Sequence, residues 1–158
     1  MIIAVLDNIR SAHNVGSIFR TADAFGISEL YLCGTTPAPK DKFGRARSDI
    51  GKVALGAEKT VAWKYYSTTR RAVSALKKKG FKIFSVEQDK KSEKTDILRT
   101  VKAKNIALVF GNEVDGVNPK ILKISDKIIE IPMFGKKESL NVSVAFGIVS
   151  HELASLDG

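Results

Sequence analysis

Short apolar runs alternate with helical patterns along this chain, and this alternation is the strongest constraint on its fold. The runs are rich in β-branched and aromatic residues and are bounded by glycine or polar residues, which is typical of buried strands. They cover residues 2–6, 29–33, 81–86, 106–110 and 127–131, with a weaker sixth candidate at residues 60–66. Strands that alternate with helices indicate an α/β fold with a mostly parallel sheet and helices on both faces.

Three helices are predicted in detail. In the first, apolar positions share one face, Asn14 is the expected N-cap, and Arg20 falls almost opposite the apolar stripe. The second begins near Ser67 and ends at Gly80. The third, from about Val142 to Leu156, is apolar nearly all round in its first turns. Such a helix needs cover on more than one side, as a partner subunit would give.

Composition predicts a single domain over residues 1–158. The chain is 44% hydrophobic and 27% charged, which is ordinary for a globular protein, and no linker, repeat or low-complexity tract divides it. A lone cysteine, Cys33, excludes an internal disulfide framework, and the two histidines, His13 and His151, offer no zinc-like cluster, so no metal is expected. The apolar run at residues 2–6 is too short for a signal sequence or a membrane span. These features predict a cytoplasmic protein without a membrane partner.

The positive charge is unevenly distributed. The net charge is +9, which favours an anionic partner. Residues 40–79 contain 12 Lys and Arg side chains and only three acidic ones, so this quarter of the chain holds all of the excess. A loop at residues 35–39 leads into Lys40, Lys42, Arg45 and Arg47, with Phe43 among them. Cations around an aromatic ring indicate an RNA contact, and a solvated surface loop is the alternative.

The lysines at positions 77–79 allow two interpretations. They complement the C-terminus of a helix and keep the surface soluble, or they contact RNA. Lys136 and Lys137 are further candidates for phosphate contacts.

The usual phosphate-binding and hydrolase motifs are missing from the sequence. No G-x-G-x-x-G follows the first strand, and neither Gly51–Gly56 nor Gly111–Gly116 is followed by Lys-Ser or Lys-Thr. No G-x-S-x-G elbow occurs, and His151-Glu152 lacks the second histidine of a metalloprotease helix. A dehydrogenase, a P-loop nucleotidase and a small-molecule nucleotide-binding protein are therefore disfavoured.

Three clusters remain, each where a predicted strand gives way to a loop or helix. They span residues 14–22, residues 110–117, and residues 131–133 with 139–143. Ligand sites in parallel sheets lie at the carboxyl ends of strands, so these positions suit a site. In order and spacing, the clusters resemble the three signature motifs of the SpoU (TrmH-like) family of RNA 2′-O-ribose methyltransferases, within the α/β-knot (SPOUT) superfamily.

The resemblance implies a deep trefoil knot in the C-terminal part, a homodimer with its active site at or near the subunit interface, and transfer RNA or ribosomal RNA as partner. It implies S-adenosylmethionine as cofactor, which carries no phosphate and needs no anion cradle. Many family members carry an added RNA-binding domain, whereas no separate RNA-binding domain is expected here. The cofactor-binding residues implied by the motifs are Gly111, Asn112, Glu113, Ile131, Met133, Ser139, Leu140 and Asn141.

The resemblance also implies the catalytic residues, Arg20 and Asn14. A ribose 2′-hydroxyl must lose its proton as it is methylated. An arginine guanidinium stays protonated in proteins, so we expect Arg20 to stabilise the developing alkoxide or to clamp a phosphate rather than to accept the proton. Glu113 and Ser139 are candidates to orient these groups or to receive the proton through water. A non-catalytic RNA-binding or assembly factor with the same fold is the alternative function.

Overall fold

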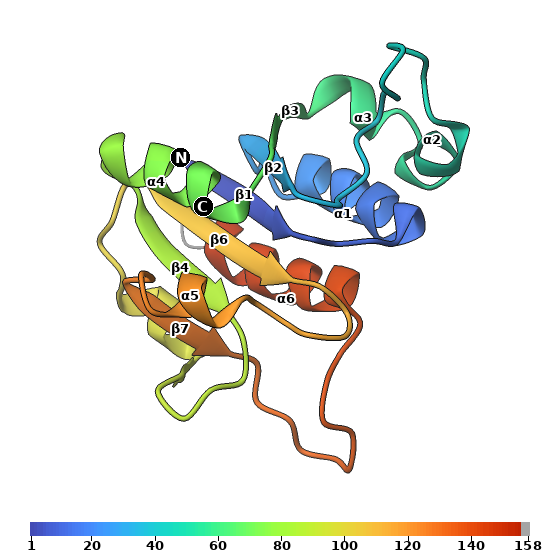
Figure 1. Cartoon of the computed structure of the whole chain (residues 1–158). Helices are drawn as coiled ribbons and strands as arrows, with labels where there is room; N and C mark the ends of the chain where they lie inside the picture. Colours follow the sequence, from blue (N-terminus) through green and yellow to red (C-terminus); the bar gives the residue numbers. More distant parts are fainter. Residues whose placement is uncertain (156–158) are drawn as a thin grey trace.

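The computed structural model describes residues 1–155, and its centre is one parallel sheet of seven strands (Figure 1). The strand order is β3-β2-β1-β6-β4-β7-β5, and every neighbouring pair runs parallel. All six predicted strands are present, and the two-residue β5 was not expected. The strands are β1 (Ile2–Asp7), β2 (Glu29–Cys33), β3 (Ala62–Tyr66), β4 (Lys82–Val86), β5 (Glu93–Lys94), β6 (Ile106–Gly111) and β7 (Lys127–Glu130).

Helices cover both faces of the sheet, as the alternating pattern predicted. One face carries α1, α2, α3, α6 and the 3-10 helix η1, and the other carries α4 and α5. The helices are α1 (Ala12–Ala24), α2 (Ser48–Ala54), α3 (Ala57–Thr60), α4 (Thr69–Lys78), η1 (Thr95–Thr100), α5 (Pro119–Leu122) and α6 (Val142–Ala154). None of the helices in residues 1–155 is long and apolar enough to cross a membrane.

Alternate residues of each central strand serve the two faces. In β1, Ala4 and Leu6 pack with α1 and α6, whereas Ile3 and Val5 pack with α4 and α5. Side chains of a strand point alternately to opposite faces, so a strand covered on both sides must be apolar at nearly every position. This requirement explains why β1 and β6 are continuous apolar runs rather than alternating ones.

The first helix begins earlier than the sequence predicted. Ser11 is its N-cap, and the Ser11 side chain accepts a hydrogen bond from the backbone N–H of Asn14 at 3.1 Å. The prediction of Asn14 as N-cap is therefore wrong. A serine three residues upstream satisfies the free N–H of the first turn, which leaves the Asn14 amide available for another contact.

The other two predicted helices are confirmed with small shifts. Thr68 caps α4, and Gly80 follows its end with a φ of +81°. The predicted end of the last helix, Leu156, lies outside the described residues. Val144 on α6 remains 50% exposed, so an apolar surface of this helix is left uncovered within the described chain.

The path of the chain brings distant segments together at one edge. Strand β6 lies between β1 and β4, although β4 precedes β6 in sequence. The chain then passes through α5 on one face and returns through residues 131–141 to α6 on the other face. The loops after β4, β6 and β7 consequently meet at the carboxyl edge of the sheet.

Candidate functional site

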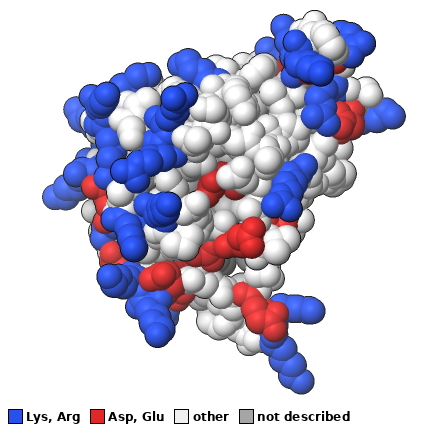
Figure 2. Space-filling view, in the orientation of Figure 1, with Lys and Arg blue, Asp and Glu red and all other residues white. Residues whose placement is uncertain are grey.

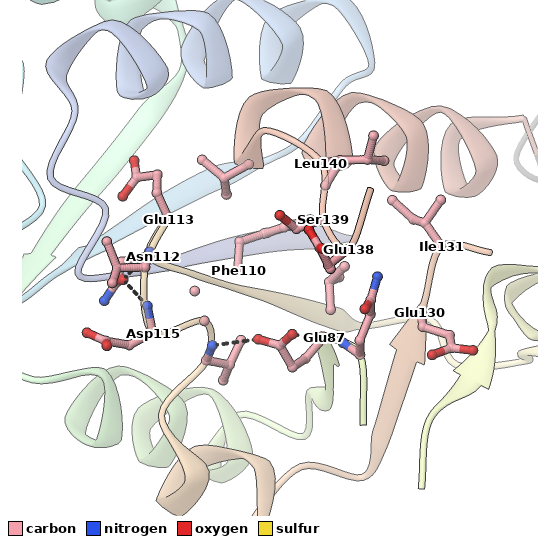
Figure 3. Close-up of a pocket in the computed structure, with 18 of the residues that line it drawn as sticks. Glu87, Phe110, Asn112, Glu113, Asp115, Glu130, Ile131, Glu138, Ser139 and Leu140 are labelled. Atoms are coloured by element: carbon pink, nitrogen blue, oxygen red, sulfur yellow. Dashed lines mark hydrogen bonds between the residues drawn. The ribbon is translucent and has the colours of Figure 1, made fainter. Parts of the chain in front are cut away.

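A cavity of about 490 Å³ lies at the carboxyl edge of the sheet, where β4, β6 and β7 end. Three loops and the first turn of α6 form its walls (Figure 3). Of the eight residues expected to bind the cofactor, seven line this cavity: Gly111, Asn112, Glu113, Ile131, Met133, Ser139 and Leu140. The eighth, Asn141, is not a wall residue and has a different role, described below.

The loop of residues 112–117 is held by its own hydrogen bonds. The Asn112 side-chain oxygen accepts from the backbone N–H of Val114 at 2.9 Å and of Asp115 at 2.7 Å. Gly116 has a φ of +68°, and a Cβ at Gly111 would lie 2.0 Å from the carbonyl carbon of Gly116. One glycine is thus required by backbone conformation and the other by space.

A chain of hydrogen bonds joins all three sequence clusters. The Asn14 side-chain amide donates to a Glu113 carboxylate oxygen at 2.8 Å. The Asn141 amide donates to the Asn14 side-chain oxygen at 3.2 Å, and the Asn141 oxygen accepts from the backbone N–H of Ser143 as the N-cap of α6. Asn14 is buried, with 6% of its surface exposed. This amide therefore fixes the position of Glu113 at the cavity relative to α1 and α6.

Glu87, directly after β4, is a cavity residue that sequence reasoning missed. One of its carboxylate oxygens accepts from the backbone N–H of Val117 at 2.9 Å, and the other accepts from that of Gln88 at 2.8 Å (Figure 3). A Cβ at Gly116 would lie 2.0 Å from the Glu87 oxygen that accepts from Val117. The carboxylate therefore fills the space that the missing side chain of Gly116 leaves. Its place at the carboxyl end of a predicted strand was the available signal.

The cavity is acidic although the protein is basic. None of its lining residues is Lys, Arg or His. In Figure 2, acidic side chains run across the middle of the face, and Lys and Arg gather to either side. A site of this charge suits a cationic ligand and repels a phosphate. The carboxylates in its wall are Glu87, Glu113, Asp115, Glu130 and Glu138.

Arg20 lies away from the cavity of its own chain. It is exposed on α1, as its place opposite the apolar stripe predicted, and it does not line the cavity. The Arg20 side chain forms no hydrogen bond or ion pair within residues 1–155, and the nearby Asp23 accepts from the Thr60 hydroxyl at 3.0 Å. The structure thus brings one of the two expected catalytic residues, Asn14, to the site and leaves the other on a free surface.

Two of the four expected RNA-binding side chains form local ion pairs. Arg45 pairs with Asp41 at 2.8 Å, and Arg47 pairs with Asp49 at 2.6 Å. The backbone N–H of Arg45 is the main group that lowers the pKa of Asp41, and the Arg47 guanidinium lowers that of Asp49. These exposed pairs contribute little stability individually and are open to competition by another anion.

The tip of the same loop presents an aromatic ring among cations. Phe43 is 70% exposed, with Lys42 Nζ 5.1 Å and the Arg45 guanidinium 5.0 Å from its ring centre. Lys40 is exposed at the base of the loop, where its backbone bridges to Ala46. The arrangement agrees with the predicted surface, on which a ring and positive charges are presented together.

The single cysteine has no place in the chemistry of this site. Cys33 is buried at the end of β2, and burial raises the pKa of its thiol to about 12. Because the thiolate is the reactive form, Cys33 is inert at neutral pH. Within residues 1–155, no group of three or more His, Cys, Asp or Glu side chains is arranged to hold a metal ion.

Comparisons with known proteins agree with the sequence clusters. The model of the SpoU rRNA Methylase family matches residues 1–151. A 23S rRNA (guanosine-2′-O-)-methyltransferase, RlmB, of Neisseria meningitidis serogroup B is 35% identical over 96% of this chain and 57% of its own length. A tRNA (guanosine(18)-2′-O)-methyltransferase of Aquifex aeolicus is 34% identical over 96% of this chain and 67% of its own length.

Solved structures share the fold over almost the whole chain. The A. aeolicus TrmH/SpoU tRNA modifying enzyme superposes with a TM-score of 0.82 at 34% identity, over 98% of this chain and 74% of that one. The AdoMet-bound rRNA methyltransferase of Sinorhizobium meliloti gives a TM-score of 0.85 at 26% identity, over 98% of this chain and 56% of that one. The chain therefore corresponds to a part of several longer relatives. With the family model matched from residue 1 to residue 151, the chain belongs to the SpoU rRNA methylase family.

Proposed function

We propose that this protein transfers a methyl group from S-adenosylmethionine to a ribose 2′-hydroxyl of transfer RNA or ribosomal RNA. The observation that carries the proposal is the hydrogen-bond chain from Asn141 through Asn14 to Glu113 at the wall of an acidic cavity. It joins the three clusters that the family shares. Relatives at 35% and 34% identity are named as guanosine 2′-O-methyltransferases of 23S rRNA and of tRNA.

The cavity fits S-adenosylmethionine by its chemistry. The cofactor carries a sulfonium and an ammonium group, and the wall offers five carboxylates and no basic side chain. Apolar side chains, among them Phe110, Ile131 and Leu140, provide surface for an adenine ring. When bound, the cofactor supplies an electrophilic methyl group and leaves as a thioether.

Two residues of this chain have separate tasks at the ribose. The 2′-hydroxyl oxygen gains the methyl group as its proton leaves. Arg20 stabilises the negative charge that develops on that oxygen or holds a neighbouring phosphate. Glu113 has one oxygen held by Asn14, which leaves the other oxygen to orient the hydroxyl or to receive its proton, directly or through water.

The position of Arg20 supports a homodimer. Arg20 does not line the cavity of its own chain, and exposed apolar side chains surround the cavity and the start of α6. They include Val114, Phe134, Leu140 and Val144. We infer that a second copy covers this apolar surface and that the complete site forms where an Arg20 meets a cavity across the interface.

The order of the strands supports the trefoil knot expected of the family. The chain leaves β6 from between β1 and β4, visits β7 on one side, and returns through residues 131–141 to α6 on the other face. The loops after β6 and β7, two of the three that build the cavity, are those that a knot in this region would interlock. We infer that residues 1–158 act as one methyltransferase domain in the cytoplasm, with the cofactor held by these loops.

Calorimetric titration with S-adenosylmethionine and a transfer assay with methyl-labelled cofactor test the proposal. We expect saturable binding at one site per chain, and label that stays on RNA as alkali-stable ribose-methylated dinucleotides. Binding without transfer to any transfer or ribosomal RNA would favour a non-catalytic assembly factor. Failure to bind the cofactor would contradict the proposal.

A further inference from the structure

The strongest unpaired positive charge of the molecule lies on α4, away from the loop at residues 40–47. No acidic residue occurs between Glu58 and Glu87 in the sequence. Five cations of this stretch lie on α4 or at its end and are exposed: Arg70, Arg71, Lys77, Lys78 and Lys79, here called the α4 surface. In Figure 2 the Lys and Arg side chains gathered at the upper left lie over this helix.

These cations are not neutralised by neighbouring carboxylates. No salt bridge of the described residues involves a side chain of the α4 surface, whereas Arg45 and Arg47 each pair with an aspartate. The Arg71 guanidinium donates to the uncharged Ser67 hydroxyl at 3.1 Å. The positive potential over α4 is therefore less screened by the protein itself than that over the 40–47 loop.

The folding of α4 does not account for its two arginines. The helix buries Ala72, Val73 and Leu76 against the sheet, so Arg70 and Arg71 add nothing to its packing. They also lie in its first turn, where the helix dipole disfavours positive charge, and no acidic residue in that turn compensates. Lys77 and Lys78, in the last turn, do complement the helix dipole. The stability of α4 therefore explains these lysines but not Arg70 and Arg71.

The arginines contribute to a recess with phosphate-binding groups. Thr68, Arg70, Arg71, Ser74 and Lys78 line this recess along one side of the helix. Guanidinium, ammonium and hydroxyl groups are the side-chain donors that hold phosphates in nucleic-acid complexes. These donors are spread along α4 from Thr68 to Lys78, so they suit successive phosphates of a nucleic-acid strand better than a single ion.

The first turn of α4 is tied to the cavity edge by one buried carboxylate. Thr69 donates its hydroxyl to Asp7, which is 3% exposed at the end of β1. The other Asp7 oxygen accepts from the backbone N–H of Asn118 at 3.0 Å, directly after the cavity loop. Asp7 thereby holds the start of α4 next to the edge of the sheet that carries the cavity.

We propose that the α4 surface binds the phosphate backbone of the RNA substrate, in addition to the 40–47 loop. This proposal rests on the proposed function, because it assigns a surface to the substrate of that activity. It assigns no sequence preference, since phosphate contacts position an RNA without reading its bases.

The test compares two triple variants that each remove three positive charges. R70A/R71A/K78A removes them from the α4 surface, and R99A/K102A/K104A removes them from exposed positions at η1 and the loop after it. Binding of a fluorescently labelled mixture of transfer RNA is measured by anisotropy between about 50 and 200 mM salt, over which phosphate contacts lose affinity steeply. Cofactor affinity and melting temperature are measured beside it.

For the α4 variant we expect RNA affinity to fall about 10- to 100-fold at low salt, and the slope of log affinity against log salt to decrease by about two. Cofactor affinity should not change, and the control variant should bind RNA within about threefold of the unmodified protein. Equal RNA affinity in the α4 variant, or an equal loss in the control, would overturn the proposal. An unmodified protein that binds RNA and cofactor but transfers no methyl group would instead speak against the proposed activity.

Discussion

Asn14 and Arg20 lie on the same helix, yet their surroundings differ completely. Asn14 is buried and bridges Glu113 and Asn141, which lie 99 and 127 residues further along the chain. Arg20 is exposed and has no partner within the described residues. The sequence clusters predicted both as site residues. The contacts of Asn14 with Glu113 and Asn141 could not be predicted, because hydrogen bonds between segments so far apart in the chain depend on the order of the strands in the sheet.

Replacement of Arg20 by alanine tests its assigned role. We expect methyl transfer to fall by about 10²–10³-fold or more, the range for loss of a group that stabilises developing negative charge. Cofactor affinity and melting temperature should stay unchanged, because Arg20 is not a wall residue of the cavity in its own chain and lies outside the core. Single-turnover kinetics and a melting curve provide the measurements.

Arg99→Ala is a suitable control for this experiment, since it removes an exposed arginine from the 3-10 helix η1. Its transfer rate should match that of the unmodified protein. Turnover retained in Arg20→Ala would refute the role given to Arg20.

Replacement of Glu87 separates its shape and hydrogen bonds from its charge. Glu87→Ala leaves the Val117 N–H without its acceptor, which costs about 1–3 kcal/mol and loosens the cavity loop. We expect at least tenfold weaker cofactor binding. Glu87→Gln keeps an acceptor oxygen for the Val117 N–H and gives up only the acceptor of the exposed Gln88 N–H, so cofactor affinity should stay within about threefold. Calorimetric titration measures both, and a glutamine variant as weak as the alanine variant would show that the charge, not the loop contact, is what matters.

At the level of elements, the cavity loop depends on two glycines that act differently. Gly116 has a left-handed conformation, whereas Gly111 lies so close to the Gly116 and Val117 backbone that a Cβ has no space. The sequence places both glycines in one of the three clusters, at residues 110–117. It did not predict Glu87 as the group that occupies the space beside Gly116, because nothing local links residue 87 to residue 116.

Gly111→Ala and Gly135→Ala make a matched pair within the same site. At Gly111 the added methyl group meets backbone atoms 2.0 and 2.1 Å away, and backbone cannot yield as a flexible side chain does. We expect a loss of about 3 kcal/mol of unfolding free energy together with loss of cofactor binding. At Gly135 nothing lies within 4 Å of the added Cβ, so stability and binding should be preserved. Chemical denaturation and calorimetry measure both quantities, and a stable, cofactor-binding Gly111→Ala protein would contradict the described loop.

Element type was predictable from the sequence, and some boundaries were not. Continuous apolar runs gave the central strands β1, β2, β4 and β6, because β-strands buried on both faces need apolar residues throughout, whereas the edge strand β3 is largely exposed and was the weaker candidate. The N-cap of α1 was misplaced, since Ser11 and Asn14 are both good capping residues and only the structure shows which of them is used. The two-residue β5 has no sequence signal, because its pairing with β7 is its only regular feature.

At the scale of the whole molecule, the distribution of charge divides the protein into parts with different tasks. The cavity is acidic within a protein of net charge +9, and the basic clusters of the 40–47 loop and of α4 lie outside it. In the proposed function, the cavity attracts the cationic cofactor and the basic clusters attract the anionic RNA. The sequence shows that residues 40–79 hold the excess charge, but the strand order that brings helix α4 to the cavity edge emerges only from the fold.

The most direct test of the account is mass-spectrometric mapping of ribose methylation in RNA from cells with and without this protein. We predict that one or more 2′-O-methylated nucleotides of transfer or ribosomal RNA are lost without it. They should return when the unmodified protein is restored and stay absent with the Arg20→Ala variant. Identical ribose methylation at every position in both sets of cells would contradict the account.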